Sequence, residues 1–416
     1  MLNLKRTVLD FIKEDEVIQL TEELCRFPSY SGAETECARF LGGFMEDNGL
    51  DVEYQEVEPG RLQPIGRIKG SEEGPSLMFN GHLDIGPVLM FTWTKRDPYE
   101  PYVRDGRIHG HGIENMKGGV AAMVMAAIAV SRSGISLSGD LVVCSVVGEL
   151  QGGVGTKYLL DQGIITDYAL DPEPSGLTVR TATAGCAEFL IHTMGLDKRV
   201  DAFEKMIKVR EALMEASRRK DFEYAYFPGK PELPLIRIGG IIGGMGREHS
   251  FFRCPPGSPE VCTVGVDVRT VPGQTEEGVK NDLIRILTRL KVDDPDFHFE
   301  IEGPPATYTE QWPLFKHFIP PCNLPPDARI VRLTAANHEM VTGEKCVVWT
   351  QLHQTAYNDC GHLQAAGIEA TTYGPIFGNY AYADGTTEDC MEISQIMTTA
   401  RVFASTAVDV CTAMKE

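Results

Sequence analysis

Hydrophobic and polar positions alternate with helical and strand periods along the first 183 residues, and the order of these periods predicts an α/β fold. Apolar residues recur at helical spacing in some stretches and form short continuous runs in others. The expected elements are helices at 7–27, 34–48, from 116 onward and up to about 160, and strands at 51–56, 64–69, 77–79, 141–147 and 167–171. Continuous apolar runs such as Leu141–Val147 are typical of parallel strands covered on both faces. The alternation predicts a mostly parallel sheet with helices on both faces.

The pattern changes after residue 183. The expected elements are then strands at 185–192, 235–242, 260–270 and 297–302, and amphipathic helices at 199–218 and 275–291. This is an α+β unit with antiparallel character. Paired prolines follow it, and from 327 the chain returns to α/β character, with a strand at 346–349, a strand at 369–373 and a terminal helix from about 389. We therefore expect a discontinuous catalytic domain, 1–183 and 304–416, with an inserted domain at 184–303.

Composition narrows the function classes. The 416 residues carry a formal net charge of −20, which disfavours nucleic acid and anionic membranes as partners. The charged N-terminus does not have the pattern of a secretory signal, and no apolar stretch is expected to reach the ~18 residues that span a bilayer. The 11 cysteines include no CxxC pair, so we expect reduced thiols in the cytoplasm and no thiolate zinc site.

Candidate chemistry begins where the strand at residue 77 ends. His82 and Asp84 are two residues apart, so an extended chain places the carboxylate beside the imidazole, a common arrangement around a metal ligand. A histidine and an aspartate in an ordinary loop explain the pair equally well. Asn115 precedes a helix and is either a ligand or an N-cap. Glu149 follows a central strand, where α/β folds place their chemistry, and Glu173 is fixed between two prolines.

An ordered set of motifs then carries a resemblance. The set is GHLD, GIENMKGG, GELQGG, PEPSG, DVRTVPG and YGP. It resembles the zinc-dependent aminoacylase/carboxypeptidase G family of peptidases and deacylases, which includes succinyl-diaminopimelate desuccinylase. The resemblance implies a mixed-sheet α/β metallopeptidase-like domain with an inserted α+β lid that also mediates dimerisation. It also implies two metal ions that share a bridging aspartate, and a homo-oligomer that is a dimer or an assembly of dimers.

Transferred residue by residue, the resemblance makes His82 the first metal ligand and Asp84 the carboxylate that orients it. Glu149 matches the general base, and Glu173 matches the glutamate that binds the first metal. Arg269 matches the lid arginine that contacts a substrate carboxylate, so a small carboxylate-bearing substrate is expected.

Three departures fall on the second metal. The bridging aspartate is Asn115, the second glutamate of the pair is Leu150, and residues 379–386 contain no histidine. The remaining donors, His82, Glu173 and Asn115, predict one divalent transition metal per chain, Mn, Zn or Co.

A single metal favours a substrate that stabilises its own addition intermediate. The chain also resembles the 5-nitroanthranilic acid aminohydrolases of this family, which implies hydrolytic deamination of a nitro-substituted aminobenzoate, 5-nitroanthranilate to 5-nitrosalicylate and ammonia. Metal-activated water would attack, Glu149 would act as base, and Tyr382 would line an aromatic pocket.

Two alternatives stay open. The first is an amidohydrolase, deacylase or peptidase acting on N-acyl amino acids, in which Asp384, His111 or His353 replaces the missing ligands. The second is a catalytically inactive binding protein in which the ligand residues are remnants.

Overall fold

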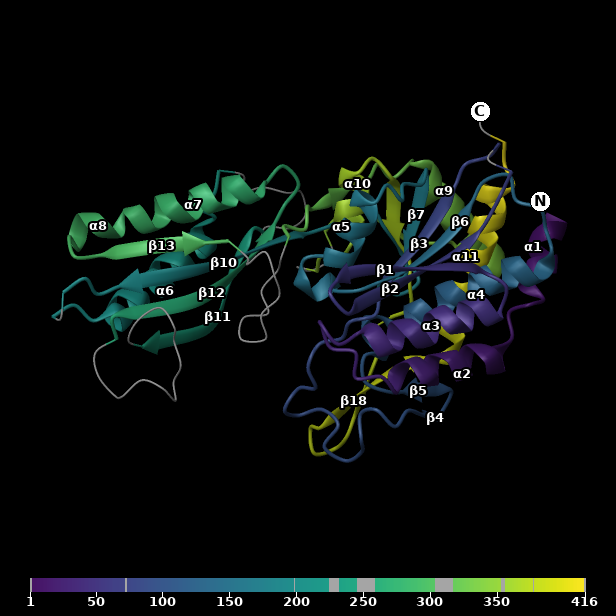
Figure 1. Cartoon of the computed structure of the whole chain (residues 1–416), viewed down its shortest axis with the longest axis horizontal. Helices are drawn as coiled ribbons and strands as arrows, with labels where there is room; N and C mark the ends of the chain where they lie inside the picture. The colour runs from purple at the N-terminus through teal and green to yellow at the C-terminus, as the bar shows by residue number, and fades with distance from the viewer. Residues whose placement is uncertain are drawn as a thin grey trace. The chain divides into compact units, whose positions relative to one another are not determined.

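The computed structural model describes residues 2–71, 73–197, 199–223, 232–244, 259–303, 317–352, 356–376 and 378–414. The chain divides into two compact units (Figure 1). Unit 1 comprises Met1–Ala182, Asn323–Thr350 and Asn358–Glu416, and unit 2 comprises Thr183–Cys322 and Gln351–Tyr357. A catalytic role for 1–183 with 304–416, and a lid role for 184–303, remain predictions.

A mixed eight-stranded sheet forms the centre of unit 1, in the order β1-β2-β6-β3-β7-β16-β8-β15. The neighbours β6, β3, β7 and β16 run parallel, while β1, β2 and β6 pair antiparallel at one side. The strands are β1 (Asp51–Glu58), β2 (Arg61–Ile68), β3 (Leu77–His82), β6 (Leu141–Val146), β7 (Tyr168–Asp171), β8 (Val179–Arg180), β15 (Val348–Trp349) and β16 (Glu369–Thr372). The predicted α/β class with a mixed sheet is confirmed.

Helices cover this sheet. They are α1 (Leu2–Leu9), α2 (Glu14–Cys25), α3 (Thr35–Asp47), α4 (Gly118–Ser133), α5 (Val154–Asp161), α9 (Arg329–Thr342), α10 (Cys360–Ala365) and α11 (Ile393–Cys411), with a π turn η1 (Ile113–Lys117) and a 3₁₀ turn η2 (Glu149–Gln151). Alternate residues of β3 point to opposite faces. Leu77 and Phe79 join the core cluster built with α4 and α11, whereas Met78 is buried outside that cluster.

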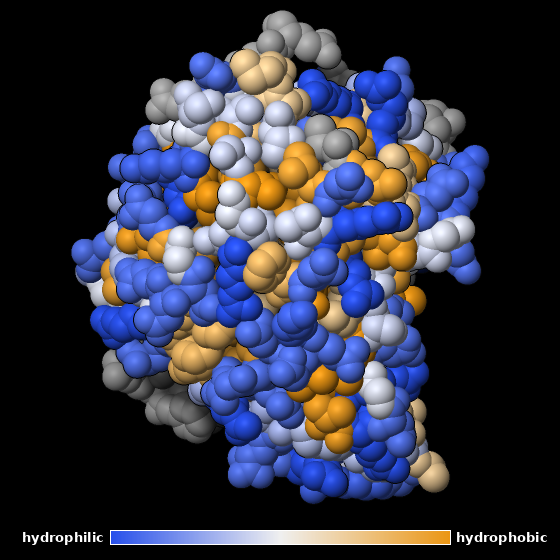
Figure 2. Space-filling view, turned by 90° about the vertical axis from the view of Figure 1, so that its right-hand side faces the viewer, coloured by the Kyte–Doolittle hydropathy of each residue, from blue (hydrophilic) through white to orange (hydrophobic). Residues whose placement is uncertain are grey.

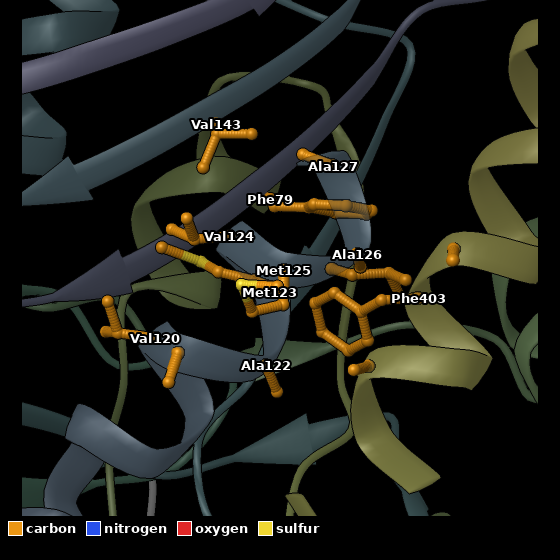
Figure 3. Close-up of a cluster of buried hydrophobic side chains, with 14 of the residues drawn as sticks. Phe79, Val120, Ala122, Met123, Val124, Met125, Ala126, Ala127, Val143 and Phe403 are labelled. Carbon is orange, nitrogen blue, oxygen red and sulfur yellow. The ribbon is translucent and has the colours of Figure 1, made fainter. Parts of the chain in front are cut away.

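The core of unit 1 is centred on Phe79. Its ring lies 4.8 Å from that of Phe403 on α11, and side chains of α4 such as Val120 and Val124 surround it (Figure 3). Helix α4 is apolar on all sides because α11, the sheet and α2 enclose it. By contrast, the face of the molecule in Figure 2 is mostly hydrophilic, with smaller hydrophobic areas between.

The expectation that no segment has the length and composition of a membrane span was wrong. Ile113–Ser133 meets both criteria. However, 89% of its most apolar window is buried inside the structure, as in the core helix of a globular domain. This segment is the central helix of unit 1.

A second sheet of unit 1 has the order β17-β18-β5-β4 and is antiparallel throughout. Its strands are β4 (Tyr102–Arg104), β5 (Arg107–His109), β17 (Asn379–Ala381) and β18 (Thr387–Glu392). The predicted terminal helix from 389 therefore begins later, at Ile393, because residues 387–389 pair with β17 and residues 390–392 pair with β5. The predicted helix at 7–27 is also two helices, separated at residues 10–13.

Unit 2 is an α+β unit, as expected. Its sheet has the order β11-β12-β10-β13, and all described pairings are antiparallel. The elements are β10 (Gly185–Met194), β11 (Leu235–Gly244), β12 (Val261–Thr270), β13 (His298–Glu302), α6 (Ala202–Arg219), α7 (Glu276–Thr288) and α8 (Leu290–Asp293). Two short strands, β9 (Ala182–Thr183) and β14 (Cys322–Asn323), lie where the chain passes between the units.

Candidate metal centre

Three of the predicted site residues lie at the carboxyl ends of adjacent parallel strands. His82 is the last residue of β3, Glu149 follows β6, and Glu173 follows β7. Because β6, β3 and β7 are parallel neighbours, their carboxyl ends meet at one edge of the sheet. The turn that presents Glu149 is bounded by Gly148 and Gly152, both with positive φ (+68° and +84°), a conformation that favours glycine.

These side chains converge on Nε2 of His82. Asn115 Oδ1 lies 2.7 Å from that nitrogen, Glu173 Oε1 lies 3.0 Å from it, and Glu149 Oε2 lies 3.9 Å from it. Ligand atoms of His82, Glu149 and Glu173 lie within 4.8 Å of one another. Asn115 does not cap α4, since it has extended backbone angles inside η1 (φ −133°, ψ 91°), and its side chain points to His82.

The Asp84 carboxylate lies beside the imidazole of His82 and also has a second role. Nδ1 of His82 lies 2.9 Å from the backbone carbonyl of Asp84 and 3.4 Å from its carboxylate. The carboxylate also accepts hydrogen bonds from the backbone N–H groups of Glu149 and Leu150, both at 3.0 Å, and from the Ser31 hydroxyl at 3.0 Å. Asp84 thus fixes the turn that carries Glu149 as well as the orientation of His82.

Burial and charge shift the proton affinities in this cluster. Burial would raise the pKa of Asp84, but its contact with His82 lowers that pKa to about 2. Burial opposes the charged form of His82, yet Asp84 and Glu173 raise its pKa well above the usual value. Burial, together with the neighbouring Glu173, raises the pKa of Glu149 well above its usual range, although His82 opposes the shift.

The donor set fits a divalent metal ion. Nδ1 of His82 donates to the Asp84 carbonyl, so Nε2 is the ring nitrogen that faces the oxygens of Asn115 and Glu173. Because the pKa of His82 is raised, a proton on Nε2 lies between these oxygens, and a metal ion held by the neutral ring would take the place of that proton. One imidazole nitrogen, one carboxylate and one amide oxygen form a mixed donor set of the kind used by Mn, Zn or Co.

The residues considered as replacement ligands are held elsewhere. Asp384 is exposed and bonds Lys95 at 2.9 Å and the Thr386 hydroxyl at 2.7 Å. The ring nitrogens of His111 lie 2.9 Å from Asp389 Oδ2 and 2.9 Å from the Gly86 carbonyl. His353 lies outside the described residues.

The two predicted substrate-binding residues also have defined partners. The Tyr382 hydroxyl donates to Glu388 at 2.8 Å, and Lys95 Nζ lies 3.8 Å from the centre of the Tyr382 ring. Arg269, in unit 2, forms an ion pair with Asp267 at 2.7 Å, and its guanidinium lies over the Tyr357 ring.

Two buried aspartates near the cluster were missed from the sequence. Asp171 Oδ1 accepts the backbone N–H of Glu173 at 2.9 Å, which fixes the ligand loop. Asp359 Oδ2 accepts the Thr156 hydroxyl at 2.7 Å, and Asp359 raises the pKa of Glu149. The Asp-Pro-Glu-Pro sequence could have indicated Asp171, whereas no local pattern marks Asp359.

The chain is similar in sequence to known deacylating enzymes. The chain is 26% identical over 435 residues to N-formyl-4-amino-5-aminomethyl-2-methylpyrimidine deformylase of Bacillus subtilis, covering 97% of this chain and 96% of the relative. It is 26% identical over 307 residues to succinyl-diaminopimelate desuccinylase of Legionella pneumophila, covering 70% and 77% of the two chains.

Solved structures show the same fold. The M20 family metallo-carboxypeptidase Sso-CP2 of Sulfolobus solfataricus superposes with a TM-score of 0.71 at 16% identity, covering 94% of this chain and 98% of that one. The YXEP protein of Bacillus subtilis, described as a dinuclear metal-binding peptidase, gives 0.65 at 14% identity, covering 96% and 99%. A sequence profile described as Peptidase family M20/M25/M40 matches residues 78–409. The resemblance inferred from the motifs is confirmed, and the chain belongs to this family of metal-dependent hydrolases.

Proposed function

We propose that this protein is a metal-dependent amidohydrolase that removes a small acyl group from the nitrogen of a small molecule. The relatives are named for releasing formyl and succinyl groups from nitrogen, and another relative is named acetylornithine deacetylase. This supports the alternative drawn from the sequence, deacylation, better than deamination of a nitroaromatic ring. The deformylase is matched over nearly its whole length, which favours a formyl or similarly small acyl group.

One observation carries the proposal. A buried imidazole nitrogen faces two oxygen donors within 3.0 Å, and a buried glutamate that is not needed to complete that set lies 3.9 Å away. A hydrolase needs both a metal site and a nearby base that can take and return a proton. A binding protein has no use for Glu149 in that position.

The chain's own residues then have distinct roles. His82, Glu173 and Asn115 would hold the ion, which, when bound, polarises a carbonyl and lowers the pKa of a water molecule. Glu149 would take a proton from the attacking water and deliver it to the leaving nitrogen. Asp84 would hold Glu149 in place through the backbone of its turn.

We further propose one ion per chain, Mn, Zn or Co. Leu150 offers no ligand atom, and Asp384 and His111 are engaged with other groups. Asn115 is neutral, so it compensates less positive charge than a bridging aspartate would. These features support a single ion in this chain, although the YXEP protein is described as dinuclear.

Deamination of 5-nitroanthranilate is the second candidate. The observation that favours it is the small set of donors, which suits a substrate able to stabilise its own intermediate. In either case Arg269 of the inserted unit would meet a substrate carboxylate by a bidentate pair, with Asp267 orienting it. Tyr382 is a weaker candidate for substrate binding, since Glu388 already engages its hydroxyl.

The inserted unit would act as the lid and dimerisation domain of a homo-oligomer. A cytoplasmic location is part of the same proposal, because ten cysteines among the described residues are buried and unpaired.

Product analysis separates the candidates. Purified protein supplied with Mn, Zn or Co is given N-formyl and N-acetyl amines, N-succinyl diaminopimelate and 5-nitroanthranilate. Release of formate or another carboxylic acid from the amides, with no ammonia from 5-nitroanthranilate, supports the deacylase. Ammonia from 5-nitroanthranilate alone supports the second candidate. No product with any substrate contradicts both.

A further inference from the structure

A cavity of about 140 Å³ lies in unit 1 next to the metal centre. Its lining residues are Gly86, Pro87, Leu89, Thr92, His111, Gly112, Glu114, Asn115 and Asp389. Asn115 belongs both to this lining and to the cluster at His82, where its Oδ1 lies 2.7 Å from Nε2. A molecule in the cavity would therefore lie directly beside the proposed catalytic cluster.

The cavity has the size of one six-membered ring. A dry cavity of about 150 Å³ in another protein holds benzene. One wall is apolar and is formed by Pro87 and Leu89. Apolar side chains of this kind suit the face of a ring rather than a highly hydrated group.

The lining also contains two acidic side chains, beside the polar Thr92 and Asn115. Glu114 and Asp389 contribute carboxylates, and Glu114 Oε1 is buried with no hydrogen-bond partner among the described residues. The His111 ring, which could otherwise offer a donor, is bonded to Asp389 and to the Gly86 carbonyl. A ligand that carries an N–H group would donate to the unpartnered Glu114 Oε1, whereas the oxygens of a carboxylate or nitro group would face those of Glu114 and Asp389.

The loop that forms the apolar wall is anchored at both ends. The Gly86 carbonyl is bonded to His111, and the backbone N–H of Trp93 donates to the Thr387 carbonyl at 2.9 Å. The loop nevertheless exposes Leu89, Met90 and Phe91 to solvent by 66%, 84% and 71%. Three consecutive exposed apolar side chains at the rim of a cavity are typical of a ligand-binding surface.

We propose that this cavity binds a single flat ring that carries an amino group, and that it holds the amine half of the substrate. The role rests on the proposed amidohydrolase function, whereas the binding itself can be tested separately. Leu89 and Glu114 would be its specificity-determining residues, one for the ring and the other for the amino group.

Isothermal titration calorimetry with benzylamine and benzoate, two ligands of one ring each and opposite charge, tests the cavity. The full-length protein is titrated both with Mn²⁺ bound and after chelation, since an amine could otherwise bind the ion itself. Benzylamine is expected to bind in both states and benzoate to bind at least about tenfold more weakly. That factor corresponds to about 1.4 kcal/mol.

Two variants on one loop provide the matched comparison. Leu89→Trp fills the cavity and is expected to weaken benzylamine binding by about tenfold or more. Met90→Trp adds the same side chain at a position outside the cavity lining and is expected to bind as the native chain does. Glu114→Gln should reduce the difference in affinity between benzylamine and benzoate.

Equal binding by the native and Leu89→Trp proteins, binding lost on chelation, or no binding by the native protein would each overturn the proposal. The same ligands keep the two proposals separate. If no amide is hydrolysed but benzylamine binds and Leu89→Trp abolishes it, the cavity assignment stands and the amidohydrolase assignment fails. If amides are hydrolysed but Leu89→Trp binds benzylamine as the native protein does, the amidohydrolase assignment stands and the cavity assignment fails.

Discussion

The carboxylate of Asp84 accepts a hydrogen bond from the backbone N–H of Glu149, with 3.0 Å between Asp84 Oδ1 and the Glu149 nitrogen. A second bond from the next N–H, that of Leu150, has the same length. Asp84 is fully buried, and it also lies beside the ring of His82. One carboxylate therefore couples the proposed metal ligand to the backbone that positions the proposed base.

Asp84→Asn is expected to lower kcat about 10- to 100-fold, the usual cost of changing a group that orients a metal site. Asparagine keeps one acceptor oxygen but turns an N–H donor toward a backbone N–H of Glu149 or Leu150. Steady-state kinetics on an amide substrate checks this, and metal content shows whether the ion is retained. The control is Asp161→Asn, an exposed aspartate paired with Lys157. Unchanged kcat in Asp84→Asn would remove Asp84 from the mechanism.

Glu149→Gln is expected to keep the metal and lose about 10²- to 10⁴-fold in kcat, because the amide cannot take the water proton. Gln has nearly the same volume and keeps one oxygen near His82 Nε2. Turnover and metal content are measured on the same preparation. A variant that binds metal normally and turns over at the native rate would show that another group is the base.

Removing the partner of a buried charge should destabilise unit 1 strongly. Arg61 donates to Glu34 through Nε at 3.0 Å and to Gln151 through Nη1 at 2.8 Å, and Glu34 is fully buried. Arg61→Met leaves that carboxylate without its cationic partner, with the Gly32 backbone N–H still donating to it, so the free energy of unfolding should fall by about 3–5 kcal/mol.

Urea unfolding followed by circular dichroism measures the loss. The exposed pair Arg39–Glu36 serves as control, and Arg39→Ala should cost less than about 1 kcal/mol. Equal losses in the two variants would mean that burial of the Arg61 pair does not determine its contribution.

Stability should also depend on pH through His109. Burial lowers the pKa of His109, although the nearby Glu388 opposes the shift. A histidine whose pKa is lower in the folded state takes up its proton more readily when unfolded, so it destabilises the fold as pH falls through about 6.5. His109→Phe keeps the stacking on Tyr102, whose ring centre lies 4.5 Å away. Between pH 7 and pH 5, the variant should therefore lose less unfolding free energy than the native chain. An identical loss in both proteins would contradict this.

Much of the fold follows from the sequence because buried parallel strands and amphipathic helices have strong local patterns. The apolar run Leu141–Val147 predicts β6 to within one residue, and its end places Glu149 at the sheet edge. The sequence pattern places the start of the terminal helix at about 389, inside β18. Residues 390–392 are a strand because they pair with β5, far away in sequence, and residues 387–389 because they pair with β17.

The candidate site also has some features that the sequence predicts and others that it does not. His82, Glu149 and Glu173 follow strands whose neighbours can be inferred, so their meeting was predictable. The bonds from Asp84 to the Glu149 turn, and the burial of Asp359 behind it, depend on loop geometry that no local pattern determines. The cavity beside Asn115 likewise forms from three separate segments.

Metal titration of amide hydrolysis tests the central claim most directly. The protein is stripped with a chelator, and hydrolysis of an N-formyl amine is followed as Mn²⁺ is added in fractions of one equivalent. We expect activity to rise from near zero and to reach its plateau at one ion per chain. Hydrolysis that needs two ions per chain would contradict the single-ion site, and no hydrolysis at any ratio would contradict the amidohydrolase itself.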